Sequence, residues 1–284
     1  MTWAEIIDKA SKDLEIAGIS EPSANVDNLA MHVLELERRS QLRSYLERTV
    51  NPLDQIKFDL LIDRRKSREP LQYILGEWEF YGLPMLVDRR ALIPRPETEI
   101  LVEEALGEAA TMTGELCILD LGTGTGAIAL ALASRLPHAS VTGIDYSLEA
   151  IALAQENLDQ LGFSNVCFEQ ADIMAPQWAD RFTGKIDLLV SNPPYVSLGD
   201  FVGLDPELHY EPREALTDES TGLTFYAQIA TIAPKLLTEQ GKLLVELGFG
   251  HAQSVSEIMQ AAGLKVLRIV NDLAGIPRVL VAAM

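Results

Sequence analysis

From residue 116 to the C-terminus, short apolar segments alternate with segments of helical periodicity, and this alternation limits the possible folds more than any other feature. Strands separated by helices form a mostly parallel sheet with helices on both faces. In such sheets, ligands bind beyond the carboxyl ends of the strands. The sequence therefore predicts an α/β fold, with strands near residues 116–121, 140–145, 165–169, 186–191, 241–247, 264–270 and 278–283.

A glycine-rich loop follows the first of these strands. Gly122, Gly124 and Gly126 precede a helix-like segment, 127–136. Glycine lets the backbone turn tightly and approach a ligand closely. The next predicted strand ends in Asp145, about twenty residues further on, where a ribose-binding acid is expected. The spacing Gly-x-Gly-x-x-Ala also satisfies a relaxed dinucleotide fingerprint, so this loop alone permits NAD as a ligand.

The motif Asn192-Pro193-Pro194-Tyr195 directly follows the strand predicted at 186–191. Proline has no backbone N–H and restricts both itself and the preceding residue, so this loop offers acceptors and few donors. The Asn192 side-chain oxygen and the Pro193 carbonyl can accept the two hydrogens of a planar amino group, and the Tyr195 ring can pack against its plane. Such a loop favours methyl transfer to nitrogen, whereas hydride transfer needs no pair of acceptors.

Acidic residues at the strand ends favour a cofactor that carries a positive charge. S-adenosylmethionine has a sulfonium cation and no pyrophosphate, so a pocket containing Asp120, Asp145 and Asp172 suits it. Together with the acceptor loop, these residues predict an S-adenosylmethionine-dependent N-methyltransferase. The glycine loop, Asp145, Asp172 and Asn192 all follow strand ends, which predicts that they share one edge of the sheet.

Residues 1–75 have helical periodicity and predict a small helical domain. Thr2 and Glu5 have the spacing of a capping box before the first helix, and Ser40 is expected to cap a short third helix. Residues 76–92 predict a β-hairpin linker, and residues 93–284 a methyltransferase domain. The basic cluster within 64–68 is interpreted as a solvated helix face, with a docking surface for a partner as the alternative.

Composition narrows the function further. A net charge of −19 over 284 residues disfavours sequence-independent binding to duplex nucleic acid, because that affinity comes from basic side chains on phosphates. We expect a cytoplasmic protein without a membrane anchor, because no apolar stretch approaches spanning length and the N-terminus lacks a signal pattern. Cys117 and Cys167 are expected to be small buried hydrophobic residues, and no metal site is expected.

Thr98 is expected to cap a helix over 99–110.

Several segments together carry a resemblance to a known family, and they span nearly the whole chain: Pro70–Gly76, Glu79–Gly82, Ile93–Glu99, Asp120–Gly126, Asn192–Tyr195 and Asp272–Gly275. The chain resembles the PrmC/HemK family, the protein-(glutamine-N5) methyltransferases that modify the Gly-Gly-Gln motif of class-1 peptide chain release factors. The glycine loop and Asn-Pro-Pro-Tyr are shared with many methyltransferases. Their combination with the Pro-Arg-Pro-Glu-Thr-Glu and Phe-Tyr-Gly segments is highly specific.

The resemblance implies a Rossmann-like class I methyltransferase sheet of seven strands behind a helical N-terminal domain that helps to recognise the release factor. It implies an enzyme that uses S-adenosylmethionine and releases S-adenosylhomocysteine. Separately, we expect a monomer that binds no nucleic acid directly and no membrane. The resemblance places the methionine part of the cofactor at Gly122, Thr123, Gly124, Thr125 and Gly126. Asp145 would bind the ribose hydroxyls, Asp172 and Ile173 would lie beside the adenine, and Asn192, Pro193, Pro194 and Tyr195 would hold the substrate glutamine. Asn192 would also contact the cofactor, and Asn192, Pro193 and Tyr195 would be the catalytic residues.

Other functions remain open at this point. An adenine-N6 nucleic-acid methyltransferase would use the same tetrapeptide, because adenine N6 is also a planar amino group. A methyltransferase for glutamine in another protein is a second alternative. A non-catalytic cofactor-binding protein and a nicotinamide dehydrogenase are further alternatives, which assays of turnover and of NAD binding would separate from a methyltransferase.

Overall fold

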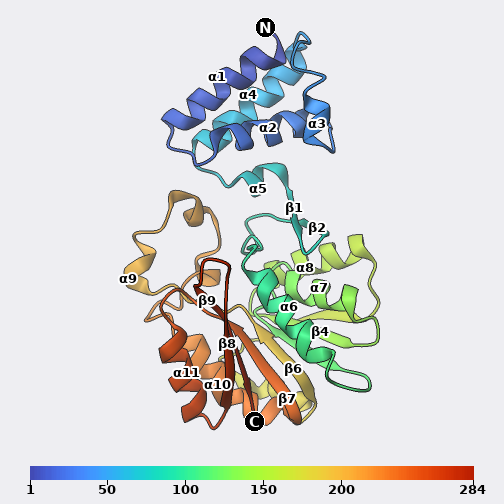
Figure 1. Ribbon diagram of the computed structural model, residues 1–284, viewed down its shortest axis with the longest axis vertical. Coiled ribbons are helices and arrows are strands. Elements are labelled where there is room, and N and C mark those ends of the chain that lie inside the picture. The colour runs from blue at the N-terminus through green and yellow to red at the C-terminus, as the bar shows by residue number, and fades with distance from the viewer. The chain divides into compact units, whose positions relative to one another are not determined.

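The computed structural model describes all 284 residues except the side chain of Pro176, and it divides into two compact units. The first unit comprises Met1–Glu77 and Asp205–Tyr210, and the second comprises Trp78–Leu204 and Glu211–Met284 (Figure 1). The first unit therefore includes a short segment that lies far along the chain from its other residues.

The first unit is helical. Its elements are α1 (Trp3–Ile16), α2 (Pro22–Val33), α3 (Arg39–Leu42), α4 (Pro52–Lys66) and α5 (Leu71–Leu75). The capping box predicted for α1 is confirmed, because the Thr2 hydroxyl accepts from the backbone N–H of Glu5 and the Glu5 carboxylate accepts from that of Thr2. The expected cap at Ser40 is wrong, because the N-cap of α3 is Arg38.

Two arginines of the basic cluster at the end of α4 form hydrogen bonds and ion pairs within the first unit. Arg65 is buried, and its guanidinium donates to Asn25 Oδ1 at 2.8 Å, to the Glu69 carbonyl at 3.1 Å and to Glu207 Oε1 at 3.0 Å. Arg68 forms an ion pair with the other oxygen of Glu207 at 2.7 Å. The interpretation of this cluster as a solvated helix face is therefore wrong for Arg65 and Arg68.

The segment that supplies Glu207 is the 3₁₀-helix η2 (Pro206–Tyr210), which belongs to the first unit. Besides the Glu207 ion pairs, the Tyr210 hydroxyl donates to the Ser67 carbonyl at 2.6 Å. Polar contacts to the end of α4 therefore hold this segment in the unit.

The second unit contains a hairpin of β1 (Glu77–Phe80) and β2 (Leu83–Leu86) and a seven-stranded sheet of order β5-β4-β3-β6-β7-β9-β8. Neighbouring strands are parallel from β5 to β7, and β9 is antiparallel to both β7 and β8. This arrangement confirms the predicted α/β fold with seven strands. The strands are β3 (Cys117–Leu121), β4 (Ser140–Asp145), β5 (Val166–Gln170), β6 (Ile186–Ser191), β7 (Leu237–Glu246), β8 (Lys265–Asn271) and β9 (Pro277–Ala283).

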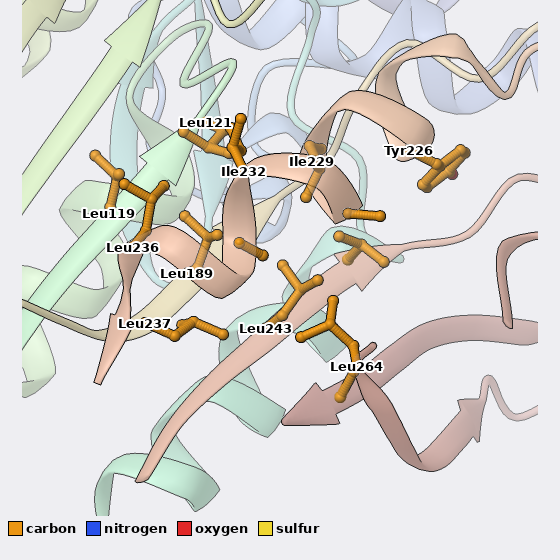
Figure 2. Close-up of a cluster of buried hydrophobic side chains, with 14 of the residues drawn as sticks. Leu119, Leu121, Leu189, Tyr226, Ile229, Ile232, Leu236, Leu237, Leu243 and Leu264 are labelled. Atoms are coloured by element: carbon orange, nitrogen blue, oxygen red, sulfur yellow. The ribbon is translucent and has the colours of Figure 1, made fainter. Parts of the chain in front are cut away.

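Helices cover both faces of this sheet. Leu119 and Leu121 of β3 alternate with residues that face the other side, as the two-residue period of a strand requires, and they share a buried cluster with α10 and α11 (Figure 2). The opposite face packs against α6, α7 and α8. The helices and the remaining 3₁₀ segments are α6 (Thr98–Ala109), α7 (Ala127–Arg135), α8 (Leu148–Leu161), η1 (Pro176–Phe182), α9 (Leu198–Phe201), η3 (Arg213–Ala215), α10 (Thr224–Leu236) and α11 (Ala252–Ala261).

The expected burial of the two cysteines is wrong. Cys117 is half-buried and Cys167 is exposed. Cys167 lies on β5, which the sheet order places at the edge. Within the described residues, none of the helices has the length and apolar character needed to cross a bilayer.

Candidate functional site

A cavity of about 480 Å³ opens at the carboxyl ends of the parallel strands in the second unit. The loops after β3, β4, β5 and β6 contribute to its wall, as the predicted convergence of strand ends requires. The residues proposed from the sequence that line it are Gly122, Thr123, Gly124, Thr125, Asp145, Asp172, Ile173, Asn192, Pro193 and Pro194. Asp120, Gly126 and Tyr195 are not among the lining residues, so the prediction that Asp120 lies in the pocket is wrong.

The glycine loop leaves backbone open to the cavity at one end and packs tightly at the other. Gly122 has a φ of +73°, and a Cβ built on it would meet no atom within 4 Å. Gly126 has a φ of +82°, and a Cβ there would lie 2.7 Å from the Phe168 ring. Gly122 therefore gives a ligand access to the backbone, whereas Gly126 allows the loop to pack on β5.

Asp145 is held by the same loop. Its Oδ2 accepts from the Gly124 backbone N–H at 2.9 Å and its Oδ1 accepts from that of Ser147 at 2.9 Å. Burial raises the pKa of this carboxyl, while these backbone hydrogen bonds favour its charged form. Each oxygen keeps a second lone pair. The carboxylate can therefore accept hydrogen bonds from a ligand while it keeps its bonds to Gly124 and Ser147.

A second carboxyl, Asp120, lies on β3 just before the glycine loop and is fully buried. Its Oδ2 accepts from the Thr123 hydroxyl at 2.7 Å, and its Oδ1 has no hydrogen-bond partner among the described residues. Burial raises the pKa of Asp120 to about 7, and the neighbouring Asp145 contributes to the increase. A buried carboxyl without full compensation favours a cation nearby.

Replacement of Asp120 by asparagine is expected to stabilise the protein at alkaline pH. The pKa of Asp120 is about 7 in the folded state, against an ordinary value of 3.8 for an aspartate in water, so the folded protein retains a proton that the unfolded chain releases. The free energy of unfolding contributed by this group therefore falls as pH rises through that window and stays low above pH 7. Asp120→Asn should raise the Tm at pH 8 relative to wild type and change it little at pH 4. An equal shift in Tm at both pH values would contradict the raised pKa of Asp120 in the folded state.

Asn192 is oriented by residues outside its own loop. Its Nδ2 donates to Thr98 Oγ1 at 3.2 Å, and the Thr98 hydroxyl donates to Glu246 Oε2 at 2.6 Å. In the described part of the chain, neither Asn192 Oδ1 nor the Pro193 carbonyl accepts a hydrogen bond. The two acceptors predicted from the sequence are therefore both available at the cavity wall.

The expected cap at Thr98 is wrong. Thr98 is the first residue of α6 and the N-cap is Glu97. The Thr98 hydroxyl cannot serve the helix end because it is engaged by Glu246 and Asn192.

Tyr195 lies away from the cavity lining. Its hydroxyl donates to Glu246 Oε1 at 3.4 Å, and its ring packs so close to Gly248 that a Cβ there would lie 2.9 Å from it. Burial raises the pKa of the Tyr195 hydroxyl well above its ordinary value. The predicted packing of this ring on a substrate amide is not seen in this arrangement and stays a prediction.

Several lining residues were missed by the sequence reasoning. Arg95 lies in a segment whose resemblance was noted without a role for its side chain, Thr98 was predicted only as a helix cap, and Phe225 gave no signal. Glu211 accepts from the Ile93 backbone N–H at 2.9 Å and pairs with Arg95. Glu211 lies more than a hundred residues from Arg95 in the sequence, so no local sequence pattern could predict this pairing.

Comparisons with known proteins identify the family of the chain. Residues 5–76 match the family model described as PrmC N-terminal domain, and residues 113–266 match the one described as methyltransferase domain. A release factor glutamine methyltransferase of Vibrio cholerae is 42% identical over 95% of this chain and 92% of its own length. One of Geobacter sulfurreducens is 40% identical over 98% of this chain and 95% of its own length.

A solved methyltransferase structure from Pyrococcus furiosus shares the fold, with a TM-score of 0.50 and 18% identity over 72% of this chain and 90% of that chain. The relatives are similar over nearly the whole chain and include both the helical and the methyltransferase regions. The chain therefore belongs to the family of release factor glutamine methyltransferases.

Proposed function

We propose that this protein transfers a methyl group from S-adenosylmethionine to the side-chain amide nitrogen (N5) of the glutamine in the Gly-Gly-Gln motif of class-1 peptide chain release factors. The observation that carries the proposal is the pair of acceptors, Asn192 Oδ1 and the Pro193 carbonyl, on the wall of the cavity. Two acceptors match the two hydrogens of a primary amide. The names of the similar proteins give a release factor glutamine as the group that those relatives methylate.

The residues of the cavity fit S-adenosylmethionine. Asp145 in the cavity wall favours a cationic ligand, as does the neighbouring Asp120, which is buried behind the lining with one carboxylate oxygen unpartnered. The open backbone at Gly122 allows close approach. We propose that the loop Gly122–Gly126 holds the methionine part, with Gly126 supporting the loop from outside the cavity lining. Asp145 would contact the ribose hydroxyls, and Asp172 and Ile173 the adenine. Ile173 packs in the apolar core beside the cavity, so it offers an aliphatic surface to a base rather than an aromatic stack.

The chemistry of the acceptor pair follows from the weak nucleophilicity of an amide nitrogen, whose lone pair is delocalised into the carbonyl. When bound, the cofactor supplies an electrophilic methyl on sulfur. Asn192 Oδ1 and the Pro193 carbonyl would hold both amide hydrogens and so direct the nitrogen toward the methyl that the bound cofactor would supply. Positive charge grows on the nitrogen in the transition state and strengthens both hydrogen bonds. The methylated nitrogen, now cationic and strongly acidic, would then lose one of these hydrogens as a proton to solvent water.

Alignment of the two reactants supplies a further part of the rate enhancement. Holding two groups in reactive geometry is worth on the order of 7–11 kcal/mol in favourable intramolecular cases. Asn192, Pro193 and Pro194 are therefore proposed as the substrate-holding residues. Tyr195 is proposed as a catalytic and substrate-binding residue that would reach the amide only if its ring left Gly248.

We also propose roles for the parts of the chain. Residues 1–75 would form the substrate-recognition domain, residues 76–92 a hairpin linker, and residues 93–284 the catalytic domain. The protein would act as a monomer in the cytoplasm, on a protein substrate and without binding nucleic acid directly.

Replacement of Asp145 by alanine is expected to weaken cofactor binding by at least about tenfold, because hydrogen bonds to a charged group contribute roughly 1.5–3 kcal/mol each. Isothermal titration calorimetry with S-adenosylmethionine measures the change. Asp159→Ala is the matched control, because Asp159 is an exposed acid of α8 bonded to Gln155. An unchanged Kd in Asp145→Ala would refute the ribose assignment.

The proposed function is tested by mass spectrometry of purified release factor after incubation with the protein and S-adenosylmethionine. A gain of one methyl on the Gln of Gly-Gly-Gln, absent when that Gln is replaced, supports the proposal. Methylation of DNA adenine or of another protein, with none at this glutamine, would overturn the substrate assignment and retain the cofactor.

A further inference from the structure

A line of hydrogen bonds runs from Asn192 at the cavity into the buried interior of the second unit. Asn192 Nδ2 donates to Thr98 Oγ1 at 3.2 Å, and Thr98 Oγ1 lies 2.6 Å from Glu246 Oε2. Thr98 and Glu246 are buried, with 4% and 1% of their surfaces exposed. The three residues come from the loop after β6, from the start of α6 and from the end of β7.

The direction of these bonds follows from the number of protons. An ionised Glu246 carboxylate only accepts, so the single proton of the Thr98 hydroxyl is committed to it. The Thr98 oxygen then has only lone pairs to offer, and the Asn192 atom that faces it must be the amide nitrogen. The Asn192 oxygen is consequently turned away from Thr98.

This orientation matters because the two ends of an asparagine amide have similar shape and opposite hydrogen-bonding character. With the nitrogen turned toward the substrate, Asn192 would present donors to an amino group that itself donates. We propose that Thr98 and Glu246 are positioning residues that hold the Asn192 amide with its oxygen available to the substrate amide. This inference rests on the proposed function.

Glu246 is placed to make this orientation depend on pH. Burial raises its pKa to about 7, hydrogen bonds from Thr98 and Tyr195 and the charge of Arg278 lower it, and Glu97 raises it. Tyr226, the other titratable group beside it, donates to the Glu246 carbonyl. A protonated Glu246 can donate to Thr98, which frees the threonine proton to bond Asn192 Oδ1 and so permits the flipped amide. Activity is therefore expected to rise with pH through about 7.

Thr98→Val tests the positioning role because valine keeps the shape and lacks the hydroxyl. We expect kcat to fall on the order of 10- to 100-fold, with the cofactor Kd changed less than about threefold. Thr98→Ser restores the hydroxyl and should recover most of the lost rate. Thr231→Val is the matched control, since the Thr231 hydroxyl bonds only the Ala227 carbonyl on the exposed side of α10. Full kcat in Thr98→Val would overturn the proposal, as would equal losses in kcat and cofactor affinity.

Glu246→Gln tests the role of the carboxylate. Wild-type kcat/KM should rise with pH to a plateau above about 7, and Glu246→Gln should lose this rise and remain below the wild-type plateau at every pH. Glutamine does not titrate, and its amide can face Thr98 in either orientation. An unchanged acid limb in Glu246→Gln would contradict the proposal.

A spectroscopic measurement keeps this test separate from that of the proposed function. In protein labelled with ¹⁵N-asparagine, the Asn192 side-chain amide resonances, assigned by their absence in Asn192→Ala, should titrate with Glu246 in wild type and be pH-independent in Glu246→Gln. If wild type fails to methylate release factor but this titration is seen, the positioning role stands and the substrate assignment fails. If methylation proceeds and the resonances do not titrate, the positioning role fails.

Discussion

Asn192→Ala is expected to lower kcat for release factor methylation by on the order of 100- to 1000-fold, the loss typical of removing one preorganised hydrogen-bonding group that stabilises transition-state charge. The substituted protein loses the Asn192 oxygen at the cavity wall, while the Pro193 carbonyl remains. The cofactor Kd should stay near the wild-type value, because Gly122–Gly126 and Asp145 are untouched. Single-turnover kinetics and calorimetry measure the two quantities independently.

The control for this prediction is Gln155→Ala, which removes an exposed amide side chain of α8 that bonds Asp159. Its kcat should equal that of wild type. Comparable losses of kcat and cofactor affinity in Asn192→Ala would mean that Asn192 supports the cavity rather than the reacting nitrogen. That result would refute the proposal that Asn192 holds the substrate amide.

Glu207→Ala is expected to destabilise the helical unit by about 3 kcal/mol, because removing one partner of a buried ion pair leaves an uncompensated charge. The Arg65 side chain is 6% exposed and loses its bond to Glu207, and Arg68 loses its ion pair with the same carboxylate. The chain has two units and need not unfold in one step. Hydrogen exchange of the α2 and α4 amides therefore measures the effect better than a single Tm.

Glu169→Ala is the matched control, because it breaks an ion pair with Arg181 in which both side chains are well exposed. Exposed pairs contribute about 0–1 kcal/mol, so amide protection should hardly change. Equal effects in the two variants, or unchanged protection of α2 and α4 in Glu207→Ala, would show that the segment around Glu207 does not stabilise the helical unit.

The sheet and the edge that carries the cavity could be predicted from the sequence because both follow from local patterns. Apolar runs separated by helical periodicity specify parallel strands. Parallel strands place Gly122, Asp145 and Asn192 at one edge of the sheet for any conformation of the loops. These residues could be predicted because Asp145 ends a strand and Gly122 and Asn192 each follow one directly. Their meeting at one cavity needed no knowledge of side-chain packing.

Contacts between distant segments could not be predicted in this way. Thr98 has the sequence context of a helix cap, and only packing brings it to Glu246, 148 residues further on. Arg65 has the sequence context of an exposed basic helix end, but it is buried and bonds Glu207, 142 residues further on. Cys167 has an apolar context, but its exposure is not evident until the sheet order makes β5 an edge strand.

The inclusion of Asp205–Tyr210 in the helical unit has a consequence for proteolysis and truncation. The chain leaves this unit after Glu77, returns at Asp205 and leaves again after Tyr210, so one cut in the hairpin linker does not separate the two units. After such a cut, Arg65 and Arg68 would still hold Glu207, and Ser67 would still hold Tyr210. The two fragments should therefore co-purify until denaturant is added, and a shortened protein starting at Trp78 would expose a segment that has lost its partners.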